Sequence, residues 1–162
     1  MATLKRTPTP ENVKKTFDRW ERNKKRIDKL VKEKIDPVYE ELAVKVCDEW
    51  VKEARYVPWI LSQIMTVEQA KLSLALPDPY RDSSWGREHL GVTEQFAKSV
   101  GLDKKTADKY LEDLRGKGFV TPHRNGYQVP RGSHTFTHGG RYKDNKDLQD
   151  ACWIFGRYHE RD

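Results

Sequence analysis

Cysteine is scarce in this chain of 162 residues, where Cys47 and Cys152 are the only two. Their spacing fits neither a metal site nor a cysteine framework, so we expect two unpaired thiols within helices. No apolar run approaches the roughly 20 residues that span a bilayer. The first six residues also lack the apolar core of a signal peptide. We therefore expect a cytoplasmic protein without a membrane segment.

The motifs that usually mark catalysis are missing as well. The chain has no nucleophile elbow, no phosphate-cradling glycine loop and no paired-carboxylate motif. His134 and His138 stand four residues apart, but glycines at 132, 139 and 140 disfavour the helix on which both would bind one metal ion. We therefore expect a protein that is not an enzyme and that has neither a cofactor nor a metal site.

Positive charge is abundant, and it is concentrated at one end of the chain. The net charge is +6. Residues 1–35 hold 12 Lys/Arg against 5 Asp/Glu, a net of +7, whereas residues 36–162 hold 19 against 20, a net of −1. A basic N-terminal arm is typical of contact with phosphates, although a solvated helix face explains it equally well.

A long amphipathic helix is expected at this basic end. Thr9 can cap its start, and Pro10 and Glu11 suit its first turn. The apolar residues then recur at heptad-like spacings, with Lys24 at one seam position. This apolar stripe consists of Val13, Phe17, Trp20, Ile27 and Val31. It predicts packing against another helix, which belongs either to the same chain or to a second copy.

Two further helices are expected before residue 77. Asp36-Pro37 repeats the start signal, and an apolar ladder from Val38 to Ala54 predicts a second amphipathic helix, with the next boundary at Pro58. Thr66-Val67-Glu68-Gln69 has the spacing of a capping box. The apolar residues after it cover most of a helix circumference, so we expect that helix to be buried and to end before Pro77.

Residues 93–131 hold the most informative pattern. Thr93 can cap a short helix that Gly101 ends, because glycine tolerates the left-handed conformation at a helix exit. Asp103 can cap the next helix. The inward face of that helix is formed by Ala107, Tyr110, Leu111 and Leu114. A short hairpin is then expected around Asn125-Gly126, a pair that favours a type I′ turn.

The segment VTEQFAKSVGLDKKTADKYLEDLRGKGFVTPHRNGYQV resembles the winged-helix core of bacterial and archaeal transcriptional regulators. Typical features are a helix ending in Gly-Leu, a capped second helix ending in Leu-x-x-Lys-Gly-Phe-Val, and a hairpin wing. The likeness implies a mainly α fold with a winged helix-turn-helix domain at 58–132. A basic helical extension (1–57) precedes that domain, and a loop with a C-terminal amphipathic helix (133–162) follows it.

The resemblance also implies which residues contact double-stranded DNA, because the second helix of this family enters the major groove. On that helix they are Lys104, Lys105, Thr106 and Lys109, and at the wing they are His123, Arg124 and Asn125. Many regulators of this kind pair through helices outside the reading module. The likeness therefore implies a dimeric, DNA-binding transcriptional regulator.

Other features favour a different use of the same fold. Asp108, Glu112 and Asp113 lie on the polar side of the second helix and are expected to repel phosphates. Residues 66–132 hold 11 Lys/Arg against 9 Asp/Glu, a net of only +2. The run AKLSLALP before a helix-turn-helix is also similar to winged-helix segments that precede ferredoxin-type modules in anaerobic bacteria. That likeness implies the alternative, a non-catalytic accessory subunit of a redox enzyme complex that binds a larger protein partner.

Overall fold

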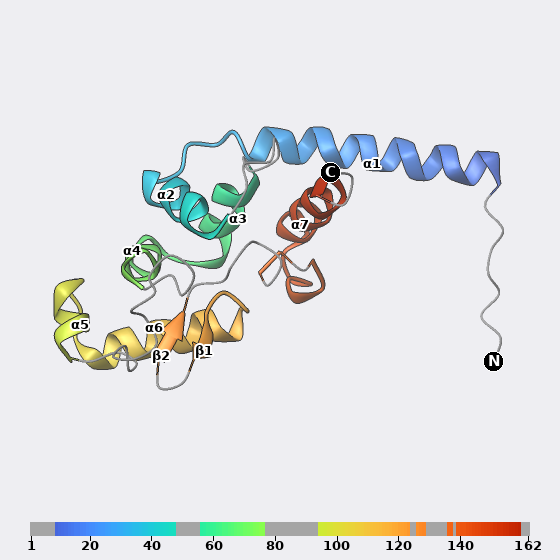
Figure 1. Ribbon diagram of the computed structural model, residues 1–162. Coiled ribbons are helices and arrows are strands. Elements are labelled where there is room, and N and C mark those ends of the chain that lie inside the picture. Colours follow the sequence, from blue (N-terminus) through green and yellow to red (C-terminus); the bar gives the residue numbers. More distant parts are fainter. Residues whose placement is uncertain are drawn as a thin grey trace, which may run out of the picture.

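The computed structural model describes residues 9–47, 56–76, 94–123, 126–128, 136–137 and 139–159. This part of the chain is mainly helical, which confirms the predicted class (Figure 1). Its helices are α1 (Pro10–Leu30), α2 (Pro37–Val46), α3 (Tyr56–Ile64), α4 (Val67–Ala75), α5 (Glu94–Ser99), α6 (Lys104–Gly116) and α7 (Lys146–His159). A 3₁₀ turn, η2 (Gly139–Arg141), precedes α7, and two short strands, β1 (Thr121–His123) and β2 (Gly126–Gln128), pair antiparallel.

Side-chain caps begin the helices where the sequence predicted them. The Thr9 hydroxyl accepts a hydrogen bond from the Asn12 backbone N–H at 3.2 Å, and Asp36 caps α2 in the same way. The capping box of α4 is complete. The Gln69 N–H donates to the Thr66 hydroxyl at 3.2 Å, and the Thr66 N–H donates to the Gln69 amide oxygen at 2.9 Å. Each cap satisfies a backbone donor that has no partner within its own helix.

The second helix is shorter than its apolar ladder suggested. α2 ends at Val46, because the Cys47 backbone is already extended. The prediction of one continuous helix up to Ala54 is therefore wrong, and residues 48–55 themselves lie outside the described part. α3 begins at Tyr56, so Pro58 lies in the first turn of a helix instead of between two helices. Proline is tolerated there, since the first N–H groups of a helix have no intrahelical acceptor.

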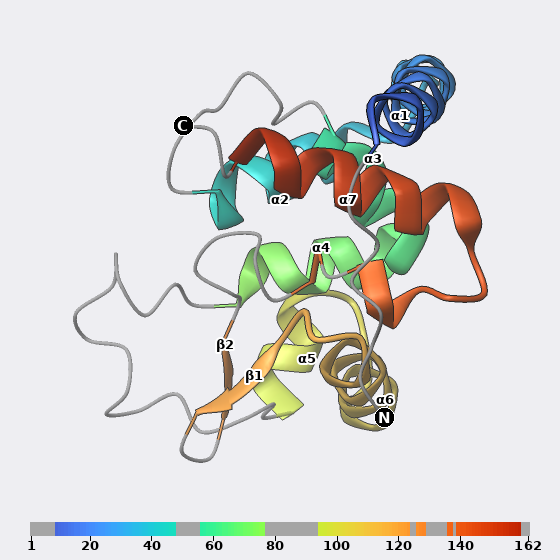
Figure 2. The same cartoon turned by 90° about the vertical axis from the view of Figure 1, so that its right-hand side faces the viewer.

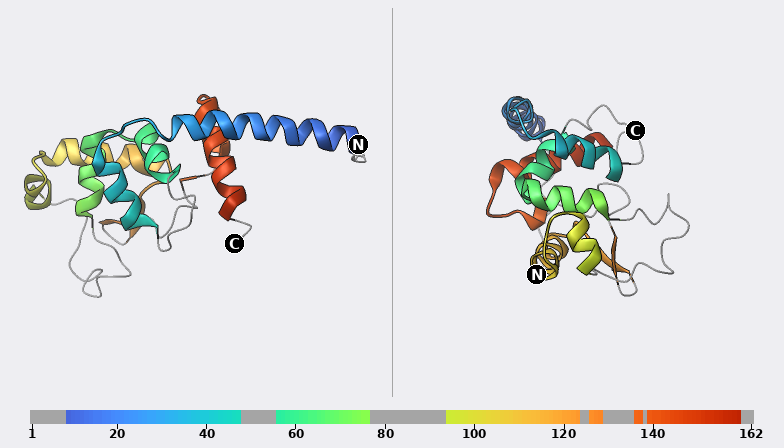
Figure 3. Two further views of the ribbon diagram at one scale, coloured as in Figure 1. Left: turned by 90° about the horizontal axis from the view of Figure 1, so that it is seen from above. Right: turned by 90° about the vertical axis from the view of Figure 1, so that its left-hand side faces the viewer.

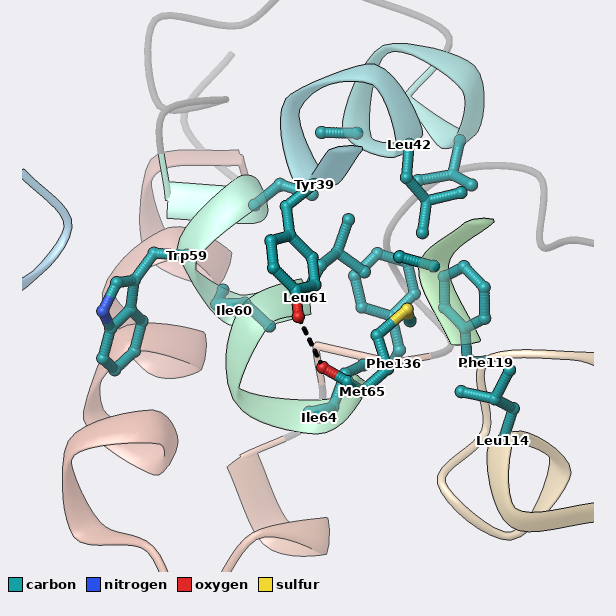
Figure 4. Close-up of a cluster of buried hydrophobic side chains, with 14 of the residues drawn as sticks. Tyr39, Leu42, Trp59, Ile60, Leu61, Ile64, Met65, Leu114, Phe119 and Phe136 are labelled. Atoms are coloured by element: carbon teal, nitrogen blue, oxygen red, sulfur yellow. Dashed lines mark hydrogen bonds between the residues drawn. The ribbon is translucent and has the colours of Figure 1, made fainter. Parts of the chain in front are cut away.

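One cluster of buried side chains joins these elements (Figure 4). Phe119 follows α6, Phe136 follows the hairpin, and both are fully buried with their ring centroids 5.3 Å apart. The Tyr39 hydroxyl donates to the Met65 carbonyl at 2.9 Å, which satisfies a buried polar group and joins α2 to the end of α3. The helices on both sides of the hairpin are therefore anchored in the same core.

α1 and α6 occupy opposite edges of the molecule. In two perpendicular views α1 lies along one edge and α5, α6 and the hairpin lie at the other, with α2, α3, α4 and α7 between them (Figures 1 and 2). α7 crosses beneath α1, where the Arg26 guanidinium contacts Asp150 at 2.5 Å and Asp147 at 3.3 Å. Lys146 contacts the other Asp150 oxygen at 2.8 Å. The buried Asp150 carboxylate thus ties α1 to α7.

The chain itself covers only one half of the apolar stripe on α1. Ile27 is fully buried, whereas Val13 and Phe17 are 56% and 59% exposed. The half of α1 that carries these two residues projects beyond α7 (Figures 1 and 3). Packing within one chain therefore explains the C-terminal half of the stripe and leaves its N-terminal half open to solvent.

Two glycines end α5 and α6 in the same way. Gly101 has a φ of 75° and Gly118 a φ of 76°, both in the left-handed region. The residues that follow them, Leu102 and Phe119, each donate a backbone N–H to a helix carbonyl at 2.9 Å. This is the Schellman arrangement, in which an apolar residue beyond the helix folds back toward it. Glycine therefore sets the turn before α6 and the turn after it.

Gly101→Ala should lower the free energy of unfolding by about 1–2 kcal/mol, because a Cβ atom strains left-handed backbone. No heavy atom lies within 4 Å of that Cβ, so backbone strain is the only expected cause. Gly116→Ala is the matched control. Its Cβ also has no neighbour within 4 Å, and alanine should stabilise this helical position by roughly 0.5–1 kcal/mol. Urea unfolding of both variants measures the effects, and shifts of the same sign would contradict the assigned helix exit.

Candidate nucleic-acid interface

The candidate interface begins at the turn between α5 and α6. Residues 100–103 separate the two helices, and Gly101 lets the chain reverse there. Asp103 then caps α6, since its carboxylate accepts a hydrogen bond from the Thr106 backbone N–H at 2.7 Å. That hydrogen bond is the main cause that lowers the pKa of Asp103. The predicted start of this helix is therefore confirmed.

The inner face of α6 is anchored on α4. Its fully buried residues are Ala107, Leu111 and Leu114. At the edge of this face the Tyr110 hydroxyl donates to the Glu68 carboxylate of α4 at 2.6 Å, and the same hydrogen bond raises the pKa of Tyr110. Apolar burial therefore sets which side of α6 faces inward, and the contact with α4 fixes its position along that helix.

A second polar link was not foreseen from the sequence. The Gln69 amide of α4 donates to Asp113 at 2.8 Å, and Lys117 donates both to Asp113 at 3.1 Å and to the Ile64 carbonyl at 2.6 Å. The Gln69 hydrogen bond is the largest cause that lowers the pKa of Asp113. The sequence indicates Gln69 only as a capping residue, because no local pattern shows that it also reaches α6.

The four predicted DNA-contacting residues of α6 differ in burial and in whether they form an ion pair. Lys104 donates to Asp108 at 2.8 Å, and this pairing raises the pKa of Lys104. Thr106 is half-buried. Lys105 and Lys109 are exposed one turn apart, opposite the buried face, and neither forms an ion pair with a described residue. The outer side of α6 therefore presents two cations to solvent.

The acidic side chains of α6 are engaged by its own and neighbouring residues. Asp108 binds Lys104, and Glu112 accepts a hydrogen bond from Arg115 at 3.2 Å. Asp113 remains exposed, as expected of the polar side, but its carboxylate is bound by Gln69 of α4 and by Lys117. Its direction follows from the docking of α4 on that side of α6. The net charge of the helix still stays small, with four Lys/Arg against three Asp/Glu.

The hairpin beside α6 has a different register from the one expected. His123 pairs with Gly126, so Arg124 and Asn125 alone separate the paired strands, and the prediction of Asn125-Gly126 as the central pair is wrong. Arg124 and Asn125, the other predicted wing contacts, lie outside the described residues, and of His123 only the backbone is described.

Pro122 gives a physical reason for this register. In an antiparallel ladder, hydrogen-bonded pairs alternate with pairs that make no ladder hydrogen bond. A central Asn125-Gly126 turn would place Pro122 in a hydrogen-bonded pair, for which proline has no N–H. The observed register pairs Pro122 with Tyr127, one step from the closing pair, where that N–H is not required.

Among the described residues no three His, Cys, Asp or Glu side chains gather as metal ligands, and His134 and His138 lie outside them. Burial raises the pKa of Cys152 to about 12, so this thiol does not form a thiolate near neutral pH. Within the described ranges, no helix has both the length and the apolarity to cross a membrane.

A fold alone does not define a function, so the exposed lysines of α6 are the feature that indicates one. Comparison with known proteins supplies no relative: no family model, no curated protein and no solved structure matches the chain.

Proposed function

We propose that this chain is a winged-helix protein that binds double-stranded DNA through α6 and the β1–β2 hairpin and acts as a transcriptional regulator. One observation carries the proposal: α6 is anchored by its inner face while Lys105 and Lys109 stand exposed on its outer face. The order α4, α5, α6 and hairpin supports the winged-helix assignment, since such domains present the second helix of the turn to the major groove.

In this proposal phosphate contacts supply most of the affinity. Lys105 and Lys109 neutralise phosphates or reach guanine edges, and Lys104 exchanges its bond to Asp108 for a phosphate oxygen. Thr106 is proposed to contact DNA from the half-buried side of the same turn. The wing residues His123, Arg124 and Asn125 are proposed to contact the neighbouring backbone. Because cations displace condensed counterions, binding should weaken as salt rises.

Lys105→Gln/Lys109→Gln should weaken binding to a random-sequence duplex roughly tenfold or more at low salt, since two phosphate contacts are lost. The slope of log affinity against log salt should become shallower by about 2. Fluorescence anisotropy over a range of salt concentrations measures both quantities. A wild-type chain that fails to bind duplex even at low salt would defeat the proposal.

The matched control is Lys32→Gln/Lys34→Gln, which removes the same charge from exposed positions just after α1. The segment between α1 and α2, which holds both residues, lies at the edge of the molecule opposite α6 (Figure 1). We expect this control to bind the random-sequence duplex with nearly wild-type affinity. An equal loss in both double variants would mean that total charge, and not the α6 surface, controls binding.

A second candidate function rests on the exposed apolar residues of α1. Val13 and Phe17 suit contact with a protein, either a second copy of the chain or a larger subunit of a redox enzyme complex. We propose this non-catalytic accessory role as the alternative. The same duplex titration separates the two candidates, because an accessory subunit of this kind requires no salt-sensitive affinity for DNA.

A further inference from the structure

α1 carries a row of cations along one flank, about a third of a turn around the helix from the buried Ile27. Positions 15, 19, 22, 26 and 29 follow spacings of four, three, four and three, which align them along one face of a helix. The row consists of Lys15, Arg19, Arg22, Arg26 and Lys29, all exposed. At 1.5 Å per residue it extends over about 21 Å. The row therefore presents a linear positive surface to solvent.

Not every member of this row is available to a ligand. Lys15 pairs with Glu11 at 3.5 Å, and Arg26 is held by Asp147 and Asp150. Arg19 and Arg22 form no ion pair with any residue in the described ranges. Asp18 lies beside the row and weakens its field, but α1 as a whole holds eight Lys/Arg against four Asp/Glu, a net of +4. Its positive charge thus exceeds that of α6.

The row and the α6 surface lie at opposite edges of the molecule (Figures 1 and 2). Ile27 marks the side of α1 that is buried against the body, and the row lies on a flank of the helix, where Arg26 is turned toward α7. Lys105 and Lys109 lie opposite the buried face of α6. Since the body of the molecule lies between the two helices, one straight duplex seated on α6 does not reach the row (Figures 1 and 2).

We infer that the cationic row of α1 is a second binding surface for the phosphate backbone of nucleic acid, so that one chain holds two duplex segments at once. The inference rests on the proposed function, in which α6 binds the first duplex. Recognition at the row depends on charge alone, because a row of side chains on a helix that touches only phosphates carries no base-specific information.

An anionic membrane fits this helix less well than a duplex does. A helix that binds a bilayer surface inserts its apolar side into the lipid and keeps its cations on the other side. On α1 the exposed apolar residues Val13 and Phe17 lie within a quarter turn of Ile27, on the side away from Arg19 and Arg22. A bilayer that met Phe17 would therefore face away from Arg19 and Arg22, whereas a duplex contacts these cations directly.

The experiment measures how many duplexes one chain binds. Short duplexes labelled with either a donor or an acceptor fluorophore are mixed with the full chain at low salt, and sedimentation gives the number of duplexes per chain. We expect two per chain and energy transfer between the labels for the wild type. Arg19→Gln/Arg22→Gln should bind one duplex and lose the transfer, while Lys32→Gln/Lys34→Gln keeps both. Unchanged thermal unfolding of these variants shows that the fold is intact.

Each remaining outcome decides between the inference and its alternatives. One duplex per wild-type chain, or two duplexes retained by Arg19→Gln/Arg22→Gln, overturns the inference. A dimer that bridges through two α6 surfaces gives the first result, with energy transfer that Arg19→Gln/Arg22→Gln retains. Binding of the wild type to anionic vesicles but not to duplex assigns the row to lipid and also overturns it. If Lys105→Gln/Lys109→Gln still binds two duplexes, the proposed function of α6 fails separately.

Discussion

Replacing Phe119 with alanine should lower the free energy of unfolding by about 3–5 kcal/mol, the range found when a buried aromatic ring is removed. The ring is fully buried and packs against Phe136 at 5.3 Å between centroids. It also follows the left-handed Gly118, so it is the apolar residue that holds the end of α6 to the core. The variant should therefore also lose affinity for duplex DNA, because α6 and β1 lose their shared anchor.

Phe17→Ala is the control for this change in side chain. Phe17 is 59% exposed on the projecting half of α1, so its removal should change the unfolding free energy of a single chain by less than about 1 kcal/mol. Urea unfolding followed by tryptophan fluorescence and circular dichroism compares the two variants. Losses of similar size would show that the core does not depend on Phe119 in the way described.

Asp150→Ala should lower the free energy of unfolding by about 2–3 kcal/mol, since charged hydrogen bonds are worth more than neutral ones. The Asp150 side chain is 4% exposed and joins Arg26 of α1 to Lys146 of α7. Both cations are largely exposed and regain water when the carboxylate is removed, which keeps the loss below that of a fully buried ion pair. Hydrogen exchange should show that α1 loses protection before the rest of the chain does.

Asp147→Ala provides the matched comparison, because Asp147 also contacts Arg26. Its side chain is 47% exposed and the contact is longer, 3.3 Å, so solvent screens the pair and the loss should stay below about 1 kcal/mol. Thermal unfolding and hydrogen exchange of both variants test the difference. If Asp147→Ala destabilises α1 as much as Asp150→Ala does, burial of the carboxylate is not what ties α1 to α7.

Local chemistry made most helix starts and exits predictable. The Thr9, Thr66 and Asp103 caps each bond a backbone N–H three residues away, so the sequence window that encodes them is short. Prediction was weaker where two local signals compete. Asn125-Gly126 favours one hairpin register and Pro122 another, and the ladder follows the proline.

The candidate site was predictable only in part. The exposure of Lys105 and Lys109 follows from the apolar spacing of α6, because residues opposite a buried face must point outward. The environment of Asp113 did not follow, since its partner Gln69 lies 44 residues away in the chain. A helical pattern shows which side of a helix is polar but not which neighbour meets that side.

By itself the sequence determined the mainly helical class, the caps and glycine exits, the inward face of α6 and the concentration of positive charge near the N-terminus. Only the tertiary structure decided that α1 projects past α7 and that its cations lie at the opposite edge of the molecule from those of α6. The reason is range: caps and turns are bonds between near neighbours, whereas the direction of α1 depends on contacts such as Arg26 with Asp150, 124 residues apart. Such contacts exist only after the helices have packed together.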